Sequence, residues 1–459
     1  MTFSISLLLF SLAAAFVGGL IYTIIGIIPG TDETATMVPV TLVLVLMGLP
    51  PVVLYSWVIG QIVAMQISHT IPTAMAALPG STMAAPMVSY CSTAKMLGIP
   101  HVAMRKMAAG SLVGSFVSVP IAILISFLLS SFGEALQPHI GLIFTIGAAI
   151  IAFISSSKWA GVIALVPFAF LIQGMQRLAV EAIGHTLFIS IFMGITIGPM
   201  ISELFSLFAP PIRATKLTNE KTKIWVAPET KENFSLYPNP FKILTKEQCF
   251  STVIASTISS LGFTLSPVGM TVLTGESEAG RKKELYDRVT STVAIQDATS
   301  NASYIAGLII PLLAFGLPLS PVAMGPCIPL FNAPPRFTIE PINNLHNYIQ
   351  VLDVFVYGML AIVAGSIVAY PMAIHKARTW TEKMFRLVSH EALIGAFVGL
   401  IFMLSYYEAG VIGIVIALVV GLIGGMLNSM FEVHTGIQFM GFYASAYIVT
   451  QLLTLGKIL

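Results

Sequence analysis

Residues 71–86 read IPTAMAALPGSTMAAP, and this stretch decides how the rest of the chain folds. It places three prolines, one glycine and three hydroxyl side chains within sequence that is otherwise as apolar as a membrane segment. A regular spanning helix does not have this composition, because an interior proline removes a helical hydrogen bond. Residues 310–320 read IPLLAFGLPLS and carry Ile, Pro, Leu, Pro and Ser at the same places, at a constant offset of 239. The pair predicts an interrupted membrane segment that occurs twice.

The composition of the 459-residue chain is that of a polytopic membrane protein. Hydrophobic residues make up 56% and charged residues only 9%, whereas soluble domains carry about 25% charged residues. The net charge of +2 is too small to predict a nucleic-acid partner, and the three cysteines form no metal-binding or disulfide pattern. Apolar runs of about 20 residues predict an all-α fold in contact with membrane lipid, with about 10–14 membrane segments, some re-entrant or broken.

A polar connector divides the chain into two halves. Residues 211–245 are rich in proline, asparagine and alternating charges, and they predict a cytoplasmic connector. It separates an N-terminal membrane repeat, residues 1–210, from a C-terminal membrane repeat, residues 246–459. The last helix of each half also opens alike, with GHTLFISIFMG at 184–194 and HTGIQFMGFYA at 434–444. Self-similarity over this length predicts an internal structural repeat.

Charged loops predict that the two halves have opposite orientations. The loop after the first interrupted segment is basic, its counterpart in the second half is not, and one helix later the bias is reversed. Basic loops face the cytoplasm, so the halves are predicted to be inverted-topology repeats, as in secondary transporters. Counting helices places residues 276–288 and both termini on the outer side. The loop after the first interrupted segment carries Lys95, Arg105 and Lys106, whereas its counterpart carries only Arg336. One helix later the first half has no Lys or Arg, whereas the second half has Lys376, Arg378, Lys383 and Arg386.

A second break lies near the N-terminus, where residues 26–39 read GIIPGTDETATMVP. Two interpretations are open. The segment is either a surface loop whose acidic residues Asp32 and Glu33 favour the first turn of the next helix, or a re-entrant tip that binds substrate or ion. In the second interpretation the substrate ligands are Pro29, Gly30 and Thr31, and the two carboxylates couple transport to an ion.

The tip of the first interrupted segment has the features of an anion site. Free backbone N–H groups and hydroxyls at a helix start bind anions readily, and irregular backbone at membrane depth persists only when it is buried in protein or lines a wet cavity. The alternative is a kinked helix whose prolines only set packing, and His69 beside it is either a packing residue or a titrating group. The predicted substrate-binding residues are Pro79, Gly80, Ser81 and Thr82, with Pro318, Leu319 and Ser320 in the second half.

The run before the second tip, residues 296–307, reads QDATSNASYIAG. Asp297, Ser300 and Asn301 recur at spacings of three and four, which place them on one helical face. Oxygen ligands of this kind suit a hard cation such as Na⁺, and a protonatable aspartate suits H⁺ equally well. A polar face that packs against the other repeat is the alternative.

At these residues the chain resembles the large membrane subunit of tripartite tricarboxylate transporters. The similarity rests on LPGSTMAAP at 78–86, on PLLAFGLPLSPVAMGP at 311–326 after the QDATSNASYIAG run, and on GIIPG at 26–30. The resemblance implies a carboxylate importer of a bacterial or archaeal inner membrane, driven by an ion gradient. It also implies a small membrane subunit and an extracytoplasmic solute-binding protein as partners.

The prediction is therefore a secondary active transporter that imports a small organic anion, a di- or tricarboxylate, coupled to H⁺ or Na⁺ and without another cofactor. A channel, a lipid-carrier flippase on the same scaffold, or a carrier for another substrate without a binding protein also fits the sequence. An intramembrane enzyme is disfavoured, because the chain has no HExxH, no GxSxG and no clustered His/Cys ligands.

Overall fold

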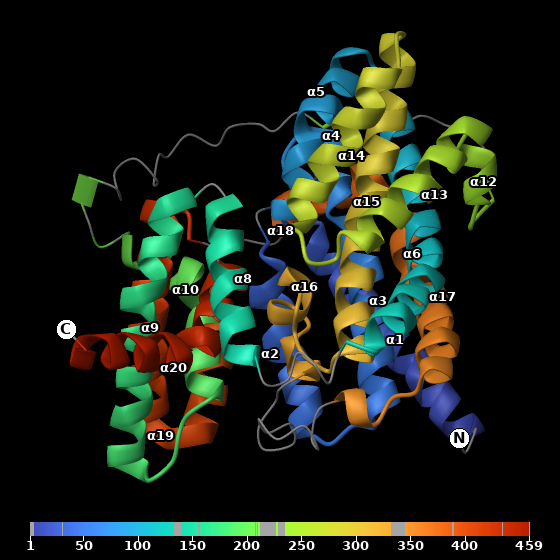
Figure 1. Cartoon of the computed structure of the whole chain (residues 1–459). Helices are drawn as coiled ribbons and strands as arrows, with labels where there is room; N and C mark the ends of the chain where they lie inside the picture. Colours follow the sequence, from blue (N-terminus) through green and yellow to red (C-terminus); the bar gives the residue numbers. More distant parts are fainter. Residues whose placement is uncertain are drawn as a thin grey trace. The chain divides into compact units, whose positions relative to one another are not determined.

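A computed structural model describes residues 4–458, except 30, 133–138, 155–156, 207, 209, 212–225, 228–234, 332–344, 388–389 and 434. The described residues form helices and no β-strand (Figure 1). Six of the helices are long and apolar enough to cross a membrane, with α3 and α4 counted together. The predicted all-α polytopic membrane fold is therefore confirmed. Most of the predicted connector 211–245, as well as Gly30 and Arg336, lies outside the described residues.

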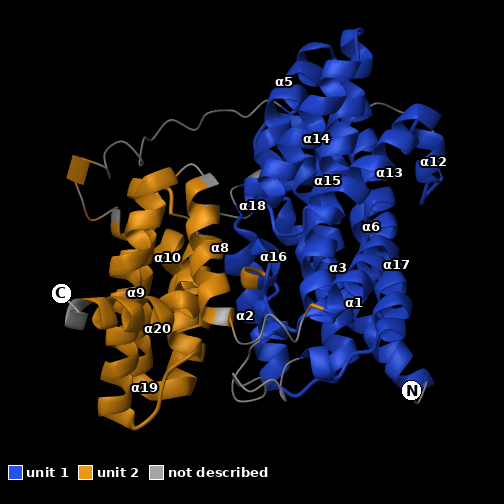
Figure 2. Cartoon of the chain, in the orientation of Figure 1, with its two compact units in different colours: residues 1–131, 223–323, 327–390 blue, residues 132–222, 324–326, 391–459 orange. Residues whose placement is uncertain are grey.

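The chain forms two compact units (Figure 2). Unit 1 comprises residues 1–131, 223–323 and 327–390, and unit 2 comprises residues 132–222, 324–326 and 391–459. Each unit thus takes segments from both predicted repeats, so contact in space groups the chain differently from repetition in sequence. The division into two repeats stays a prediction.

Unit 1 holds the interrupted segments. Its first-half helices are α1 (Ile5–Gly26), α2 (Glu33–Leu46), α3 (Pro51–Ser68), α4 (Thr70–Ala76), η1 (Thr82–Met87), α5 (Val88–Met96) and α6 (Pro100–Ser130). The end of the connector forms α12 (Pro240–Ile243). From the second half come α13 (Lys246–Leu261), α14 (Pro267–Arg281), α15 (Leu285–Ala314), α16 (Pro321–Met324), η3 (Ile328–Leu330), η5 (Leu345–Asn347), α17 (Val351–His375) and α18 (Ala377–Leu387).

The same succession of elements occurs twice in unit 1. α3 and α4 end at Ala77, which has φ 58°, and α15 is followed by Gly316, with φ 63°. In each case a serine, Ser81 or Ser320, lies four positions after the residue with positive φ. Its hydroxyl accepts a hydrogen bond from a backbone N–H of the short helix that follows. Residues that are 239 positions apart in the two segments therefore share backbone conformation as well as residue type.

The two repeated helices run antiparallel where they meet. Ser300 on α15 donates to Gln66 Oε1 on α3 at 2.5 Å, while Asp297, one turn earlier on α15, lies beside Thr70 at the start of α4. Residue numbers thus rise along one helix as they fall along the other. This is the relation that two repeats of opposite orientation require.

Small residues bring the central helices of unit 1 into close contact. A Cβ added to Gly365 of α17 would lie 2.7 Å from the Gly60 Cα on α3, and one added to Gly110 of α6 would lie 2.2 Å from the Ala294 carbonyl oxygen on α15. Backbones that approach this closely are typical of packed membrane helices. In each of these two pairs one helix comes from the first half of the chain and the other from the second half.

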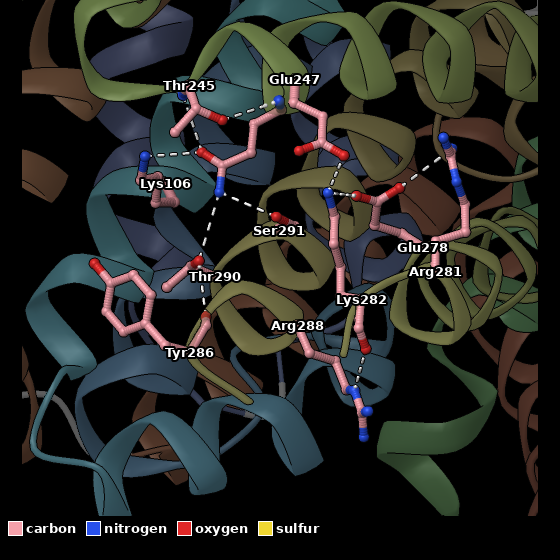
Figure 3. A network of polar contacts seen from close by, with 11 residues as sticks. Lys106, Thr245, Glu247, Glu278, Arg281, Lys282, Tyr286, Arg288, Thr290 and Ser291 are labelled. Atoms are coloured by element: carbon pink, nitrogen blue, oxygen red, sulfur yellow. Dashed lines mark hydrogen bonds and ion pairs between the residues drawn. The ribbon is translucent and has the colours of Figure 1, made fainter. Parts of the chain in front are cut away.

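Helices α13 and α14 correct the predicted topology. The apolar run 249–273 is no single span, because Gly262 ends α13 and Pro267 begins α14, which returns to the same end. Lys282 Nζ forms an ion pair with Glu247 across the open end of this hairpin (Figure 3). The helix count treated the run as one crossing and placed residues 276–288 on the side opposite to residues 95–106, whereas the structure brings both to one end of unit 1.

A polar network fixes this end of unit 1 (Figure 3). Lys106, at the start of α6, donates to Gln248 Oε1 at 2.8 Å and to the Ile243 carbonyl. Gln248 in turn donates to Ser291 Oγ at 3.1 Å. The loop 95–106, the end of the connector and the loop 276–288 thus share one end. We expect this basic end to face the cytoplasm.

At the opposite end of unit 1, the described segments that lead into α3 and α17 carry no Lys or Arg. The starts of α3 and α17 lie together there, because the Tyr55 hydroxyl donates to the Val354 carbonyl at 3.2 Å. The segments that lead into these helices, 47–50 and 345–350, contain no Lys or Arg. These segments therefore contrast with the basic end of unit 1.

Unit 2 consists of α8 (Ile140–Ile154), α9 (Lys158–Ile183), α10 (Ile189–Ser206), α19 (His390–Phe431) and α20 (Thr435–Ile458). α19 is kinked at Ala409 and Gly410, where the backbone is not helical. Glu408, just before the kink, accepts hydrogen bonds from the backbone N–H groups of Phe188, Ile189 and Ser190 at 2.6–2.7 Å. Its carboxylate thus caps α10, as a negative charge does at a helix N-terminus.

Candidate functional site

The first break and the first tip form one structure. The Thr31 N–H donates to the Gly80 carbonyl at 3.1 Å, and Thr31 pairs with Ser81 in a parallel bridge. The Thr82 hydroxyl donates to Glu33 Oε2 at 3.1 Å. Two stretches about 50 residues apart in sequence therefore meet, and the predicted residues Thr31, Gly80, Ser81 and Thr82 lie together.

The acidic pair has two different roles in this arrangement. Asp32 Oδ1 accepts a hydrogen bond from the Ala35 N–H at 2.7 Å and so caps α2. Glu33 is only 3% exposed, and its Oε1 has no hydrogen-bond partner. Asp32 thus fits the capping interpretation and Glu33 fits the tip interpretation. Pro29 lies in the turn after α1.

His69 joins the first tip at the junction of α3 and α4. Its Nδ1 is hydrogen-bonded to Ser81 Oγ at 2.7 Å, and its Nε2 is buried without a partner. Gly80 packs directly against the His69 backbone, because a Cβ on Gly80 would lie 2.2 Å from the His69 carbonyl oxygen. Pro72 lacks an N–H, so it cannot donate the helical bond to the Ser68 carbonyl. The helix is thus broken where the tip docks.

The second tip satisfies its polar groups internally. Ser320 Oγ donates to the Gly307 carbonyl at 2.5 Å and accepts from the Ala323 N–H at 2.9 Å. Pro311 frees that carbonyl in the same way that Pro72 frees Ser68. The Leu319 N–H donates to the Leu317 carbonyl at 2.8 Å across Pro318.

The first break and the second tip both lie near the same part of α15. Asp32 and Glu33 of the first break act electrostatically on the buried Tyr304 hydroxyl. Gly307, three residues further along, holds Ser320 of the second tip. The structure therefore places the acidic residues of the first break and the serine of the second tip near neighbouring turns of a single helix.

The predicted ion-coupling residues on α15 face the first half. Asp297 and Asn301 are fully buried, with Thr70 and Ser111 beside Asp297. Asn301 Nδ2 donates to Ser111 Oγ at 2.9 Å, while Ser300 reaches Gln66 on the opposite side. These contacts also fit the packing alternative, but both oxygens of Asp297 and Oδ1 of Asn301 are left without a hydrogen bond.

Three residues of this region have no counterpart among the predicted ligands. Gln66, Thr70 and Ser111 complete the polar surroundings of α15 from the first half. Gln66 was detectable as one of two amides, with Gln61, in an otherwise apolar helix. Thr70 and Ser111 were not, since a hydroxyl in a membrane helix usually bonds its own backbone.

The sequence as a whole was compared with known proteins. The model of the tripartite tricarboxylate transporter TctA family matches residues 12–435. The chain belongs to this family. Neither the curated proteins nor the solved structures give a significant match. The predicted resemblance is therefore confirmed over nearly the whole chain.

Membership of the TctA family makes the chain a membrane component of a transporter that works with partner subunits. TctA is a transporter family and no enzyme family. Among the described residues no group of three or more His, Cys, Asp or Glu side chains is arranged to hold a metal ion.

Proposed function

We propose that the chain is a secondary active transporter that imports a small organic anion, a di- or tricarboxylate, together with H⁺ or Na⁺. The observation that carries the proposal is that the first break, the second tip and two buried carboxylates, Glu33 and Asp297, gather around α15, with no ion pair to either carboxylate among the described residues. A protein that transported an anion without a coupled cation would not bury two negative charges beside its binding site.

The substrate carboxylates are bound by the two tips. The ligands are the hydroxyls and backbone N–H groups of residues 29–31, 79–82 and 318–320. Of these, Ser81 and Thr82 lie beside Glu33, which would repel an anion unless a cation or proton compensates its charge. Binding of the cation or proton therefore raises the affinity for the substrate, and the substrate raises the affinity for the cation or proton by the same factor.

The ion is bound by Asp297, Ser300 and Asn301, with Asp32 and Glu33 on the substrate side. The antiparallel contact of α3 with α15 supports inverted repeats, in which the site lies at the repeat interface. The transporter operates in a bacterial or archaeal inner membrane. A small membrane subunit and an extracytoplasmic solute-binding protein serve it.

Uptake into proteoliposomes tests this proposal. The purified chain, with and without candidate partner subunits, is reconstituted and offered radiolabelled di- and tricarboxylates under an imposed Na⁺ or proton gradient. We expect saturable accumulation against the substrate gradient that collapses with an ionophore. A channel would show flux without accumulation, and a flippase would transport labelled lipid instead; either result would reject the proposal.

A matched pair of variants locates the site. Ser81→Ala removes the hydroxyl that His69 contacts at 2.7 Å, so we expect the substrate KM to rise about tenfold, the loss typical of one good hydrogen bond. Ser126→Ala removes an equally buried hydroxyl that only bonds the Ala122 carbonyl of its own helix. This control should leave KM unchanged. Equal effects of the two would show that the first tip does not bind substrate.

A further inference from the structure

A column of polar side chains lies between α13 and α15, apart from the tips and from the ion-coupling residues. Its members recur along each helix at spacings of three, four or seven residues, which keep them on one helical face. None of them is more than 4% exposed. The polar column comprises Thr252, Ser256 and Ser259 of α13 and Thr292, Gln296 and Ser303 of α15.

Two contacts fix the register of the two helices. Near the start of both, Gln248 Nε2 donates to Ser291 Oγ at 3.1 Å (Figure 3), and further along the hydroxyls of Ser259 and Ser303 are hydrogen-bonded at 2.5 Å. Between these contacts the helices run in the same direction for about 17 Å. The polar column therefore extends from the basic end of unit 1 to the level of the second tip, because Ser303 lies one turn before Gly307, which holds that tip.

Between its two ends the polar column contains oxygen atoms that no protein group satisfies. The buried atoms without a hydrogen-bond partner are Thr252 Oγ1, Ser256 Oγ, Thr292 Oγ1 and Gln296 Oε1. A hydroxyl in a helix usually bonds its own backbone, and Ser260 of α13 and Thr290 of α15 do so. Buried polar atoms that the protein leaves unpaired are normally bonded to ordered water.

The chemistry of the polar column favours water over an ion or a carboxylate. Its six side chains are uncharged, and their hydroxyl and amide groups include both donors and acceptors. A buried ion requires an opposite charge beside it, whereas a buried water requires only two to four polar partners. The Lys106 ammonium lies at the basic end alone, where it donates to Gln248 Oε1 at 2.8 Å.

We propose that the polar column binds a chain of ordered water molecules that extends from the basic end of unit 1 to the level of the second tip. The waters bridge the oxygens of α13 and α15 that direct hydrogen bonds leave unpaired. The inference goes beyond the proposed function, because these residues bind neither the substrate nor the coupling ion. The route follows a different face of α15 from Asp297 and Asn301, which meet helices of the first half.

Proton exchange at an introduced thiol tests for water inside the column. The full chain with Ser256→Cys is transferred to D₂O in nanodiscs, and loss of the S–H stretching band is followed by infrared difference spectroscopy against the parent chain. Ser260→Cys is the control, because Ser260 is equally buried on the same helix and donates to the Ser256 carbonyl at 2.8 Å. A thiol in a dry interior exchanges only when the structure opens locally, so we expect exchange at position 256 to be about a hundredfold faster. Equal rates at the two positions would overturn the proposal.

A second substitution tests the direction of the route. Thr252 lies one turn closer to the basic end than Ser256, and valine has its shape without the hydroxyl. In the Ser256→Cys chain, Thr252→Val should slow thiol exchange about tenfold, the effect of one lost hydrogen bond. Thr271→Val should leave the rate unchanged, because the Thr271 hydroxyl is equally buried and donates to the Pro267 carbonyl of its own helix, α14. An unchanged rate in the Thr252→Val chain would overturn the proposal.

The sign of a stability change gives a test that needs no cysteine. If the Thr252 hydroxyl is bonded to water, Thr252→Val removes a satisfied group and leaves that water short of a partner, so the thermal unfolding midpoint should fall by about 2–4 °C. If the hydroxyl is dry, the same change removes an unpaired polar group and the midpoint should rise. A midpoint above that of the parent chain would therefore overturn the proposal. Neither measurement uses a substrate, so both outcomes are independent of the proposed transport function.

Discussion

The first and second tips have the same backbone device and different side-chain chemistry. In both, a proline frees a helix carbonyl, a residue with positive φ turns the chain, and a serine begins the next helix. Ser320 returns its hydroxyl to the freed Gly307 carbonyl, so the second tip is satisfied within itself. Ser81 instead contacts His69, beside Glu33, and both of these side chains keep an unpartnered buried atom.

The difference indicates that the two copies of the tip have different roles, one structural and one in ligand binding. A fully hydrogen-bonded tip is rigid and contributes a fixed wall to the site. A tip with unpaired buried groups is unstable until something binds, because each unsatisfied polar atom costs about 1–3 kcal/mol. We therefore expect ligand and ion to act mainly on the first tip.

The largest effect expected from this comparison is on transport. Glu33→Gln keeps the shape of the side chain and its contact with Thr82 while removing the charge. We expect the uptake rate to fall at least tenfold, since hydrogen bonds to charged groups contribute about 1.5–3 kcal/mol. Ser320→Ala should instead lower the free energy of unfolding by about 1–3 kcal/mol, because it leaves the Gly307 carbonyl unpaired, and it should raise KM less than Ser81→Ala does.

Uptake and thermal unfolding measured on both variants decide the matter. If Ser320→Ala raised KM as much as Glu33→Gln reduces the rate, the two tips would be functionally equivalent. The hypothesis that the two tips have different roles would then be wrong.

The sequence predicted the repeated tips and the helical membrane fold because prolines and hydrophobicity act locally. The offset of 239 was enough to pair Ser81 with Ser320. It was not enough to place Glu33 against Thr82, because that contact depends on how the loop after α1 folds back. The sense of the α13–α14 hairpin was missed for a related reason: an apolar run of about 25 residues has the length of a span, whether or not it turns at Gly262.

The positive-φ residues give a reciprocal test of the shared backbone. Ala77 has φ 58° and its counterpart Gly316 has φ 63°, and a side chain in this region costs about 1 kcal/mol or more. Ala77→Gly should therefore raise the free energy of unfolding by about 1 kcal/mol, whereas Gly316→Ala should lower it by more. In the second case the new Cβ would also lie 2.9 Å from the His346 ring.

Denaturant unfolding of the two variants in detergent measures both effects. Changes of the same sign would contradict the equivalence of the two turns. A gain of stability in Ala77→Gly that came with slower uptake would show that strain at the first tip serves transport.

The hairpins that precede the tips differ as well, and this gives the smallest effect. α1 contains no charged residue, so no ion pair can join it to α2, whereas Lys282 joins α14 to Glu247 of α13. The hydrogen bond and charge of Lys282 lower the pKa of Glu247. Burial lowers the pKa of Lys282, but its bonds and charges with Glu247 and Glu278 outweigh this and raise it.

The signs define the pH window of the contribution. A lowered carboxyl pKa stabilises the fold above its ordinary value of about 4.3, and this is lost as pH falls through the folded pKa. A raised lysine pKa stabilises the fold below about pH 10.4, and this stabilisation is lost as pH rises through the folded pKa.

We expect Glu247→Gln to lower the unfolding midpoint slightly at pH 7 and to flatten its decline in acid. The effect is small because Glu247 is 66% exposed and exposed pairs contribute little. An acid limb that stays as steep in Glu247→Gln would assign it to other carboxylates and leave the hairpin closed by packing alone.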